Sequence, residues 1–138
     1  MTERRKIGTA SRNDVRRQAL AAAEAASSKK ADDIVVLDVG EIIAITDFFV
    51  IVSGANDRQV RTIVEEVERR LAADFAIRPI RTEGLDDARW VLVDYGDFFV
   101  HVFHHETRAF YQLERLWSDA PRIPFEGGGA EAAEAAGP

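Results

Sequence analysis

The stretch WVLVDYGDFFVHVF, residues 90–103, decides the fold of this chain. Two β-prone runs flank the DYGD segment, where Gly96 tolerates a positive φ and the aspartates can bond to backbone amides, so the stretch predicts a tight hairpin. Side chains alternate between the two faces of a strand. One face of the first run therefore carries Trp90, Leu92 and Asp94, and the other carries Val91, Val93 and Tyr95.

Both faces of this predicted hairpin are largely apolar, which places it in the middle of a sheet. A sheet that is apolar on both faces must be covered on both, by helices, by a second sheet or by a partner protein. The possibility of a partner is what connects the fold of this chain to its function.

The composition limits the class of protein. With 138 residues, 46% of them hydrophobic and 30% charged, the chain is long enough for one domain with one core. It contains no cysteine, which excludes disulfides, thiolate metal sites and cysteine nucleophiles. No apolar run approaches the roughly 20 residues of a membrane span, so we expect a cytoplasmic protein that does not enter a membrane.

Charge is distributed unevenly along the chain. Residues 1–30 contain eight Lys or Arg and three acidic residues, a net charge of +5, whereas the whole chain carries −6. The remainder is therefore strongly acidic. An acidic body repels phosphate, so we expect no sequence-specific binding of nucleic acid and a basic protein surface as the partner.

The first half of the chain predicts a helix, two strands and a second helix. Residues 1–10 are read as a flexible basic arm, and Ser11 with Asp14 resembles the capping pair of a helix that ends near residues 27–30. The β-branched runs 33–39 and 47–52 predict neighbouring antiparallel strands. Asn56 with Gln59 predicts the next helix cap. The helix that follows has an apolar stripe of Val60, Ile63, Val64, Val67 and Leu71.

The second half predicts three strands and a closing helix. Residues 75–81 are read as a strand at an edge because Pro79 cannot donate to a ladder, and residues 82–89 as a polar loop before the hairpin. Residues 106–117 place Phe110, Leu113 and Trp117 on one face of a single helix. The domain is thus predicted to span residues 11–120, and a Gly, Ala and Glu-rich tail, residues 121–138, to be disordered.

Two groups of residues invite a chemical role. His101, His104 and His105 lack any known ligand spacing, and neighbouring positions on a strand face opposite ways, so no metal site is predicted. Asp38 and Asp47 could hold a magnesium ion for nucleotidyl transfer, although aspartates at strand ends more commonly cap turns. No catalytic triad is visible. We predict no catalytic residue and no cofactor.

Five segments resemble, in order and spacing, the ribosomal silencing factor (Iojap) family. They are KADDIVVLDV at 30–39, ITDFFVIVSG at 45–54, WVLVDYGD at 90–97, VHVF at 100–103 and RAFYQLERLW at 108–117. The resemblance implies an α/β fold with a mixed sheet of about five strands flanked by helices in the order α-β-β-α-β-β-β-α, similar to a nucleotidyltransferase core but without catalysis.

The same resemblance implies a function and a partner. Proteins of this family bind the large ribosomal subunit through large-subunit ribosomal protein fourteen, block joining of the small subunit sterically and repress translation when nutrients are scarce. By this resemblance Trp90 is the expected anchor, with Asp94, Tyr95, Asp97 and Tyr111 as further contacts. A metal-dependent nucleotidyltransferase and a large-subunit assembly factor remain as alternatives, and a homodimer is a further possibility.

Overall fold

The hairpin forms as the sequence predicts. Strands β4 (Trp90–Asp94) and β5 (Phe98–His104) pair antiparallel, and Gly96 adopts a φ of 84° in the turn between them. The carboxylate of Asp94 accepts a hydrogen bond from the backbone N–H of Gly96 at 2.7 Å. These features come from a computed structural model, which describes residues 11–125.

The hairpin lies inside a five-stranded mixed sheet with the order β1-β2-β5-β4-β3. Strands β1 (Asp32–Asp38) and β2 (Phe48–Gly54) pair antiparallel as predicted, whereas β2 runs parallel to β5. Every residue of β2 is buried. The short strand β3 (Arg81–Glu83) pairs with β4 and forms one edge of the sheet. The predicted α/β class and order of elements are confirmed.

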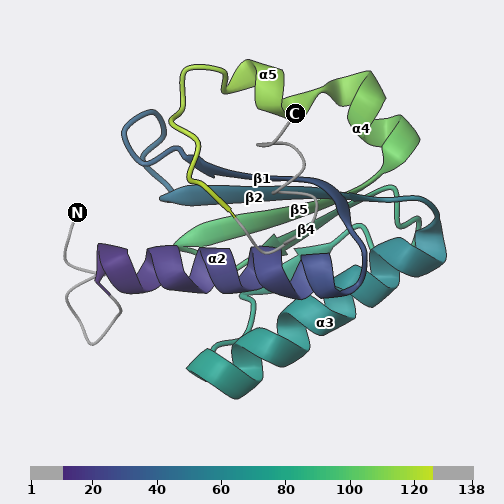
Figure 1. The fold of residues 1–138 in the computed structure, drawn as a ribbon, viewed down its shortest axis with the longest axis horizontal. Coiled ribbons are helices and arrows are strands. Elements are labelled where there is room, and N and C mark those ends of the chain that lie inside the picture. Colours follow the sequence, from purple (N-terminus) through teal and green to yellow (C-terminus); the bar gives the residue numbers. More distant parts are fainter. Residues whose placement is uncertain (1–10, 126–138) are drawn as a thin grey trace, which may run out of the picture.

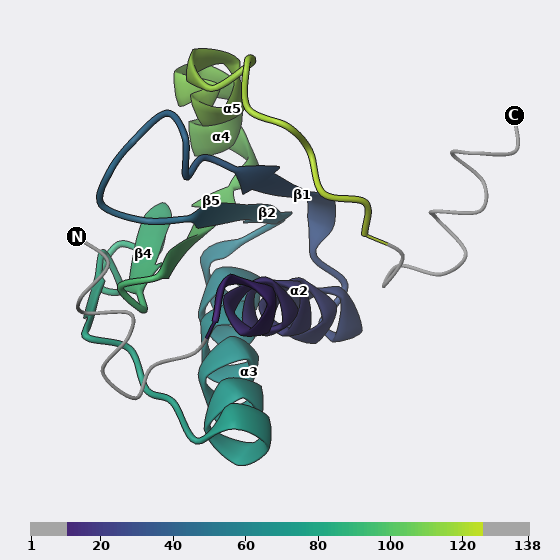
Figure 2. The same ribbon diagram turned by 90° about the vertical axis from the view of Figure 1, so that its left-hand side faces the viewer.

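Two helices cover the lower face of the sheet in the view of Figure 1. Helix α2 (Arg12–Ser28) begins with the predicted capping box of Ser11 and Asp14, and α3 (Asp57–Phe75) begins at Asn56, whose side chain accepts from the N–H of Gln59. The two helices pack side by side (Figure 2). They bury the predicted stripe of Val60, Ile63, Val64, Val67 and Leu71 against the sheet. This face is therefore fully covered.

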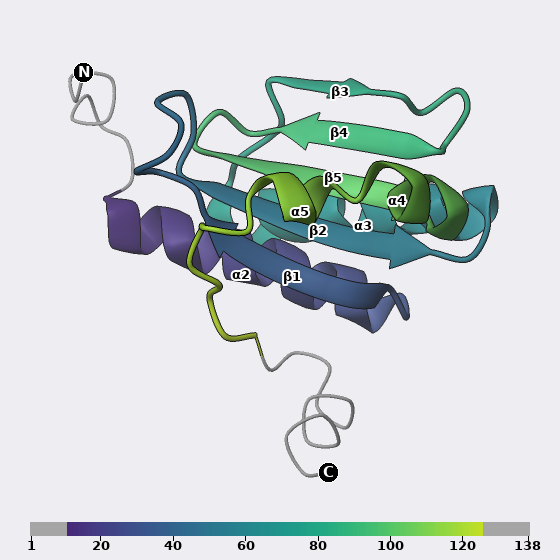
Figure 3. The same cartoon turned by 90° about the horizontal axis from the view of Figure 1, so that it is seen from above.

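The upper face of the sheet is only half covered. Helices α4 (His105–Tyr111) and α5 (Leu113–Leu116) lie over β2 and β5, while no element within residues 11–125 crosses β4 and β3 on this side (Figure 3). A second, smaller core forms beneath the two short helices. Its buried members are Leu37, Val39, Phe49, Ile51, Phe103, Leu113 and Ala120.

The strand predicted at residues 75–81 is wrong. Phe75 lies four residues after Leu71, so it continues the apolar stripe of α3 and is the last residue of that helix. Ala76 caps the helix with a φ of 57°. The third strand begins at Arg81 instead. The predicted loop 82–89 therefore loses its first two residues to β3.

The single closing helix predicted at residues 106–117 is also wrong. Gln112 adopts a φ of 48° and separates α4 from α5, so the spacing of a continuous helix does not hold across it. Leu113 is buried and Trp117 packs against the smaller core, as expected, but Phe110 is 79% exposed. The break turns Phe110 away from the apolar face that the periodicity assigned to it.

The start of the predicted tail belongs to the domain. Pro121 accepts a hydrogen bond from the backbone N–H of Asp38, and Ile123 donates one to the carbonyl of Val36, both at 2.8 Å. This segment therefore covers the outer edge of β1, which would otherwise present free backbone groups. Residues 1–10 and 126–138, the predicted arm and most of the tail, lie outside the described residues.

Candidate functional site

The uncovered half of the upper sheet face forms a surface of mixed character. Strand register places Glu83 opposite Leu92 and Arg81 opposite Asp94, while Phe99 follows on β5. We define the open face as the five side chains of this region that solvent reaches. They are Arg81, Glu83, Trp90, Leu92 and Phe99.

Trp90 is half-buried on the open face and is held from three sides. Its indole Nε1 donates a hydrogen bond to Nδ1 of His101 at 3.1 Å. Its ring lies 4.8 Å from the ring of Phe103 and 5.1 Å from that of Tyr111, measured between centroids. Tyr111 comes from α4 and is 53% exposed. The structure thus joins Trp90 and Tyr111, two of the five predicted contact residues, in one aromatic cluster.

Two of the other predicted contact residues, Asp94 and Asp97, flank the hairpin turn. Asp94 is buried, where it accepts from Gly96 and lies 3.4 Å from Nε of Arg81. The carbonyl of Asp97 accepts from the backbone N–H of Asp47 at 2.9 Å. Neither residue contributes its side chain to the open face as defined above.

Tyr95 lies on the opposite side of the sheet, as the alternation of side chains predicts. Its ring stacks on Phe98 at 4.8 Å, and burial together with the nearby Glu68 carboxylate raises the pKa of its hydroxyl. It packs against the core beneath α2 and α3. Tyr95 is therefore remote from Trp90 although the two residues are close in sequence.

His101, for which the sequence predicted no binding role, lies directly beside Trp90. It is 6% exposed, and burial lowers the pKa of its imidazole to about 4, so the ring is neutral near pH 7. Because Nδ1 accepts from Trp90, the single proton resides on Nε2. The alternation of β5 places His101 on the same face as Trp90, a signal that could have identified the pair.

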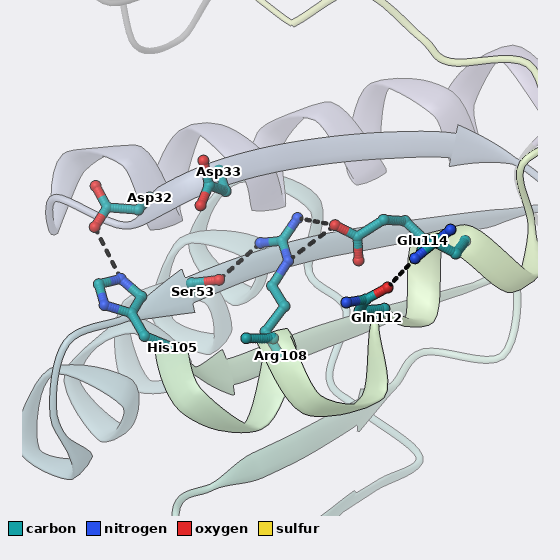
Figure 4. A pocket seen from close by; sticks show the side chains of 9 residues that line it. Asp32, Asp33, Ser53, His105, Arg108, Gln112 and Glu114 are labelled. Atoms are coloured by element: carbon teal, nitrogen blue, oxygen red, sulfur yellow. Dashed lines mark hydrogen bonds and ion pairs between the residues drawn. The ribbon is translucent and has the colours of Figure 1, made fainter.

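A polar cleft lies on the other side of α4 from the open face (Figure 4). The buried guanidinium of Arg108 donates to Oγ of Ser53 at 2.7 Å and, through Nε and Nη2, to Oε2 of Glu114 at 3.1 and 2.9 Å. Burial alone would raise the pKa of Glu114, but these hydrogen bonds lower it. Arg108 thereby connects α4, the helix that carries Tyr111, to α5 and β2.

The other histidines and the two aspartates considered for magnesium make structural contacts. His105 Nε2 lies 3.0 Å from Oδ2 of Asp32, and His104 caps α4 by accepting from the N–H of Glu106. Arg12 lies between the carboxylates proposed for magnesium, 2.5 Å from Asp38 and 4.0 Å from Asp47. A guanidinium therefore occupies the position that a metal ion would need.

The described part of the chain contains neither a metal-binding cluster nor a membrane-spanning helix. Residues 11–125 contain no group of three or more His, Asp or Glu side chains placed to hold a metal ion. Among the helices of this region, none combines the length and the apolar character that a membrane span requires. The open face combines an accessible indole with apolar and charged side chains, and these residue types suit binding to a protein.

A family model and several relatives of known identity match this chain, and they agree on one family. The family model described as "Ribosomal silencing factor during starvation" matches residues 12–137. The ribosomal silencing factor of Bacillus subtilis is 45% identical over 107 residues, which cover 78% of this chain and 90% of that protein. The chloroplast protein Iojap of Zea mays is 34% identical over 110 residues, 78% of this chain and 47% of that protein.

A solved structure shares the fold of this chain. The crystal structure of a protein from Chromobacterium violaceum matches with a TM-score of 0.72 at 29% identity, covering 80% of this chain and 91% of that one. Ribosomal silencing factors bind the ribosome and are not enzymes. The chain belongs to the family of ribosomal silencing factors that act during starvation.

Proposed function

We propose that the open face docks on the large ribosomal subunit through large-subunit ribosomal protein fourteen. The observation that carries this proposal is the uncovered half of the upper sheet face, where Trp90 and Leu92 remain accessible on an interior strand. A sheet that is apolar on both faces is normally covered on both. The docked partner would supply the cover that α4 and α5 give to the other half.

The residue types of the open face favour a protein partner. Trp and Tyr are enriched among the few residues that contribute most binding energy in interfaces, and Trp90 with Tyr111 forms a rigid pair at one end of the face. Trp90 is already held by His101, so little side-chain freedom is lost on docking. The pair is therefore the expected anchor.

The acidic charge of the domain favours a partner with a basic surface. The chain carries a net charge of −6, although its first 30 residues carry +5, so the body of the domain is acidic. Charge complementarity of this kind accelerates association and disfavours partners of like charge. A basic ribosomal protein fits this surface better than exposed phosphate groups do.

Silencing then follows from occupancy alone. A folded domain bound to the face of the large subunit that meets the small subunit excludes the latter by volume, and no chemical step is needed. Free large subunits would accumulate with the protein bound, and translation would fall when the protein is abundant, as under nutrient limitation. This account assigns the protein no catalytic residue and no cofactor.

The test is the affinity of the purified protein for isolated ribosomal protein fourteen. Trp90→Ala should weaken binding by about 30-fold or more, because an aromatic anchor contributes at least about 2 kcal/mol. Leu116→Ala is the matched control, since Leu116 is an exposed apolar residue of α5 outside the open face, and it should bind as the wild type does.

Two outcomes would count against the proposal. Absence of measurable binding by the folded wild-type protein would remove the partner, and equal affinities of the Trp90 and Leu116 variants would remove the open face as the site. Accumulation of immature large subunits in a deletion strain grown in rich medium would instead favour a role in subunit assembly.

A further inference from the structure

We propose that the cavity beside Trp90 receives one arginine side chain of the docking partner and that Glu83 selects it. This inference rests on the proposed function, because it specifies which side chain the open face accepts. It concerns a cavity of about 330 Å³ whose lining comes from three strands and the loop after β3. The lining residues are Glu83, Gly84, Trp90, Leu92 and His101.

The lining of this cavity matches the two parts of a long basic side chain. Trp90 and Leu92 supply an apolar wall, and strand register places the side chain of Glu83 directly across from Leu92 on the same face. Arginine and lysine pack an apolar stem along such a wall and keep the charged end at a polar rim. The carboxylate of Glu83 is the acidic group that lines this cavity.

The charges around the cavity favour a bound cation and allow Arg81 to give up its contact with Glu83. Burial keeps His101 neutral, so the floor does not repel a positive group. Arg81 is already paired here, with its Nε 3.2 Å from Oε2 of Glu83 and 3.4 Å from Oδ2 of Asp94. The side chain of Glu83 is 59% exposed and that of Asp94 10%, so the ion pair with Asp94 is the better shielded one.

Arg81 can therefore release Glu83 without becoming unpaired. An incoming guanidinium would take the exposed carboxylate of Glu83 while Arg81 stays with Asp94, and every charge keeps a partner throughout. Because an exposed ion pair contributes little, breaking the contact between Arg81 and Glu83 costs little. The pair formed with a docked partner is shielded from water and is worth more.

The backbone keeps Glu83 close to Trp90. Gly84 has a φ of 94°, and a Cβ built there would lie 2.3 Å from the carbonyl oxygen of Trp90, so the chain approaches more closely than any other residue allows. Arg61 holds the following loop by donating to the carbonyls of Leu85 and Asp86. The cavity is thus formed before the partner arrives.

Arginine fits this arrangement better than lysine does. Its planar guanidinium donates two parallel hydrogen bonds to one carboxylate, and it lies against aromatic rings with less loss of hydration than an ammonium group suffers. A cavity that pairs one carboxylate with an indole ring uses both properties.

The experiment compares Glu83→Gln with Glu65→Gln for binding to ribosomal protein fourteen at several salt concentrations. Glu65 is an exposed glutamate of α3 on the far side of the sheet and serves as the matched control. Glu83→Gln should bind about tenfold more weakly at low salt and show a shallower salt dependence. Glu83→Asp, which keeps the charge, should recover part of the affinity, and thermal unfolding should confirm that all three variants are folded.

A second set of variants changes the arginines of the partner. Replacing them one at a time by Met should identify one substitution that weakens binding to the wild type but not to Glu83→Gln, as expected for directly paired residues. Equal affinity and salt dependence of the Glu83 and Glu65 variants would overturn the inference, as would tighter binding of Glu83→Gln, which would indicate an apolar occupant. Either result leaves the proposed function intact, whereas failure of the wild type to bind removes both.

Discussion

His101 explains why Trp90 keeps one orientation on a half-covered sheet. An indole exposed on one side would ordinarily sample several rotamers, but its N–H is directed to Nδ1 of a histidine that the core holds in place. The imidazole ring lies 4.7 Å from Phe49 and 6.4 Å from Phe103. His101 therefore acts on the open face through Trp90, and its neutral state is part of that arrangement.

This arrangement makes stability depend on pH in a defined window. The pKa of His101 is about 4 in the folded protein and 6.5 as its ordinary value, so the unfolded chain binds a proton first as pH falls. The free energy of unfolding should therefore drop between pH 6.5 and 4, by roughly 3 kcal/mol in total from this group. His101→Phe should lose this component, which urea denaturation at pH 7, 5.5 and about 4 would measure.

Carboxylates titrate near the lower end of that window, so the difference between wild type and variant is the informative quantity. An identical pH dependence for wild type and His101→Phe would show that the imidazole is not held neutral by burial. The variant also leaves the Trp90 N–H without its acceptor, and weaker partner binding with retained fold at pH 7 is the second expected effect.

Of the five contact residues that the resemblance implies, the structure brings Trp90 and Tyr111 into one aromatic cluster, and the contact role of all five stays a prediction. Side chains alternate between the two faces along β4, so Tyr95 and Trp90 lie on opposite faces. This placement was predictable from the two-residue period of a strand alone. The engagement of Asp94 with Gly96 and Arg81 depends on the turn and on a neighbouring strand. No local pattern reports a contact between residues that distant in sequence.

At the level of elements, the connection between α4 and α5 decides where Tyr111 lies. Glutamine is not a residue type that signals a helix break. The break at Gln112 is stabilised by tertiary contacts of Arg108 and Leu113. The helical spacing of residues 106–117 therefore predicted one helix where two exist. The helix starts at Ser11 and Asn56 were predictable because capping is a local interaction.

Arg108→Met tests the role of this connection. Removing a buried guanidinium leaves the Glu114 carboxylate without its cation, which should lower the free energy of unfolding by about 3 kcal/mol. The double variant Arg108→Met with Glu114→Leu should recover much of this loss, because no unpaired charge remains. Urea denaturation midpoints at constant slope would report both values.

The same variants separate folding from docking. If Arg108 fixes Tyr111 beside Trp90, the double variant should bind the partner less well than its recovered stability suggests. Equal stability of wild type and Arg108→Met would show that the contact with Glu114 is unimportant, and unchanged partner affinity of the double variant would show that Tyr111 does not depend on Arg108.

In the whole molecule, the two faces of the sheet are covered to different extents. Its lower face is closed by α2 and α3, its β1 edge is covered by residues 121–123, and its β3 edge is short and charged, which discourages pairing with another sheet. The described fold thus leaves the upper face over β3 and β4 open. The contrast between two protected edges and one half-open face is the feature on which the proposed docking rests.

Subunit association tests the central claim most directly. Purified small and large subunits are mixed with excess protein, and the fraction of joined ribosomes is measured by sedimentation. The account predicts that the wild type suppresses joining and sediments with free large subunits but not with joined ribosomes, whereas folded Trp90→Ala leaves joining unimpaired. Normal joining in the presence of excess wild-type protein would contradict it.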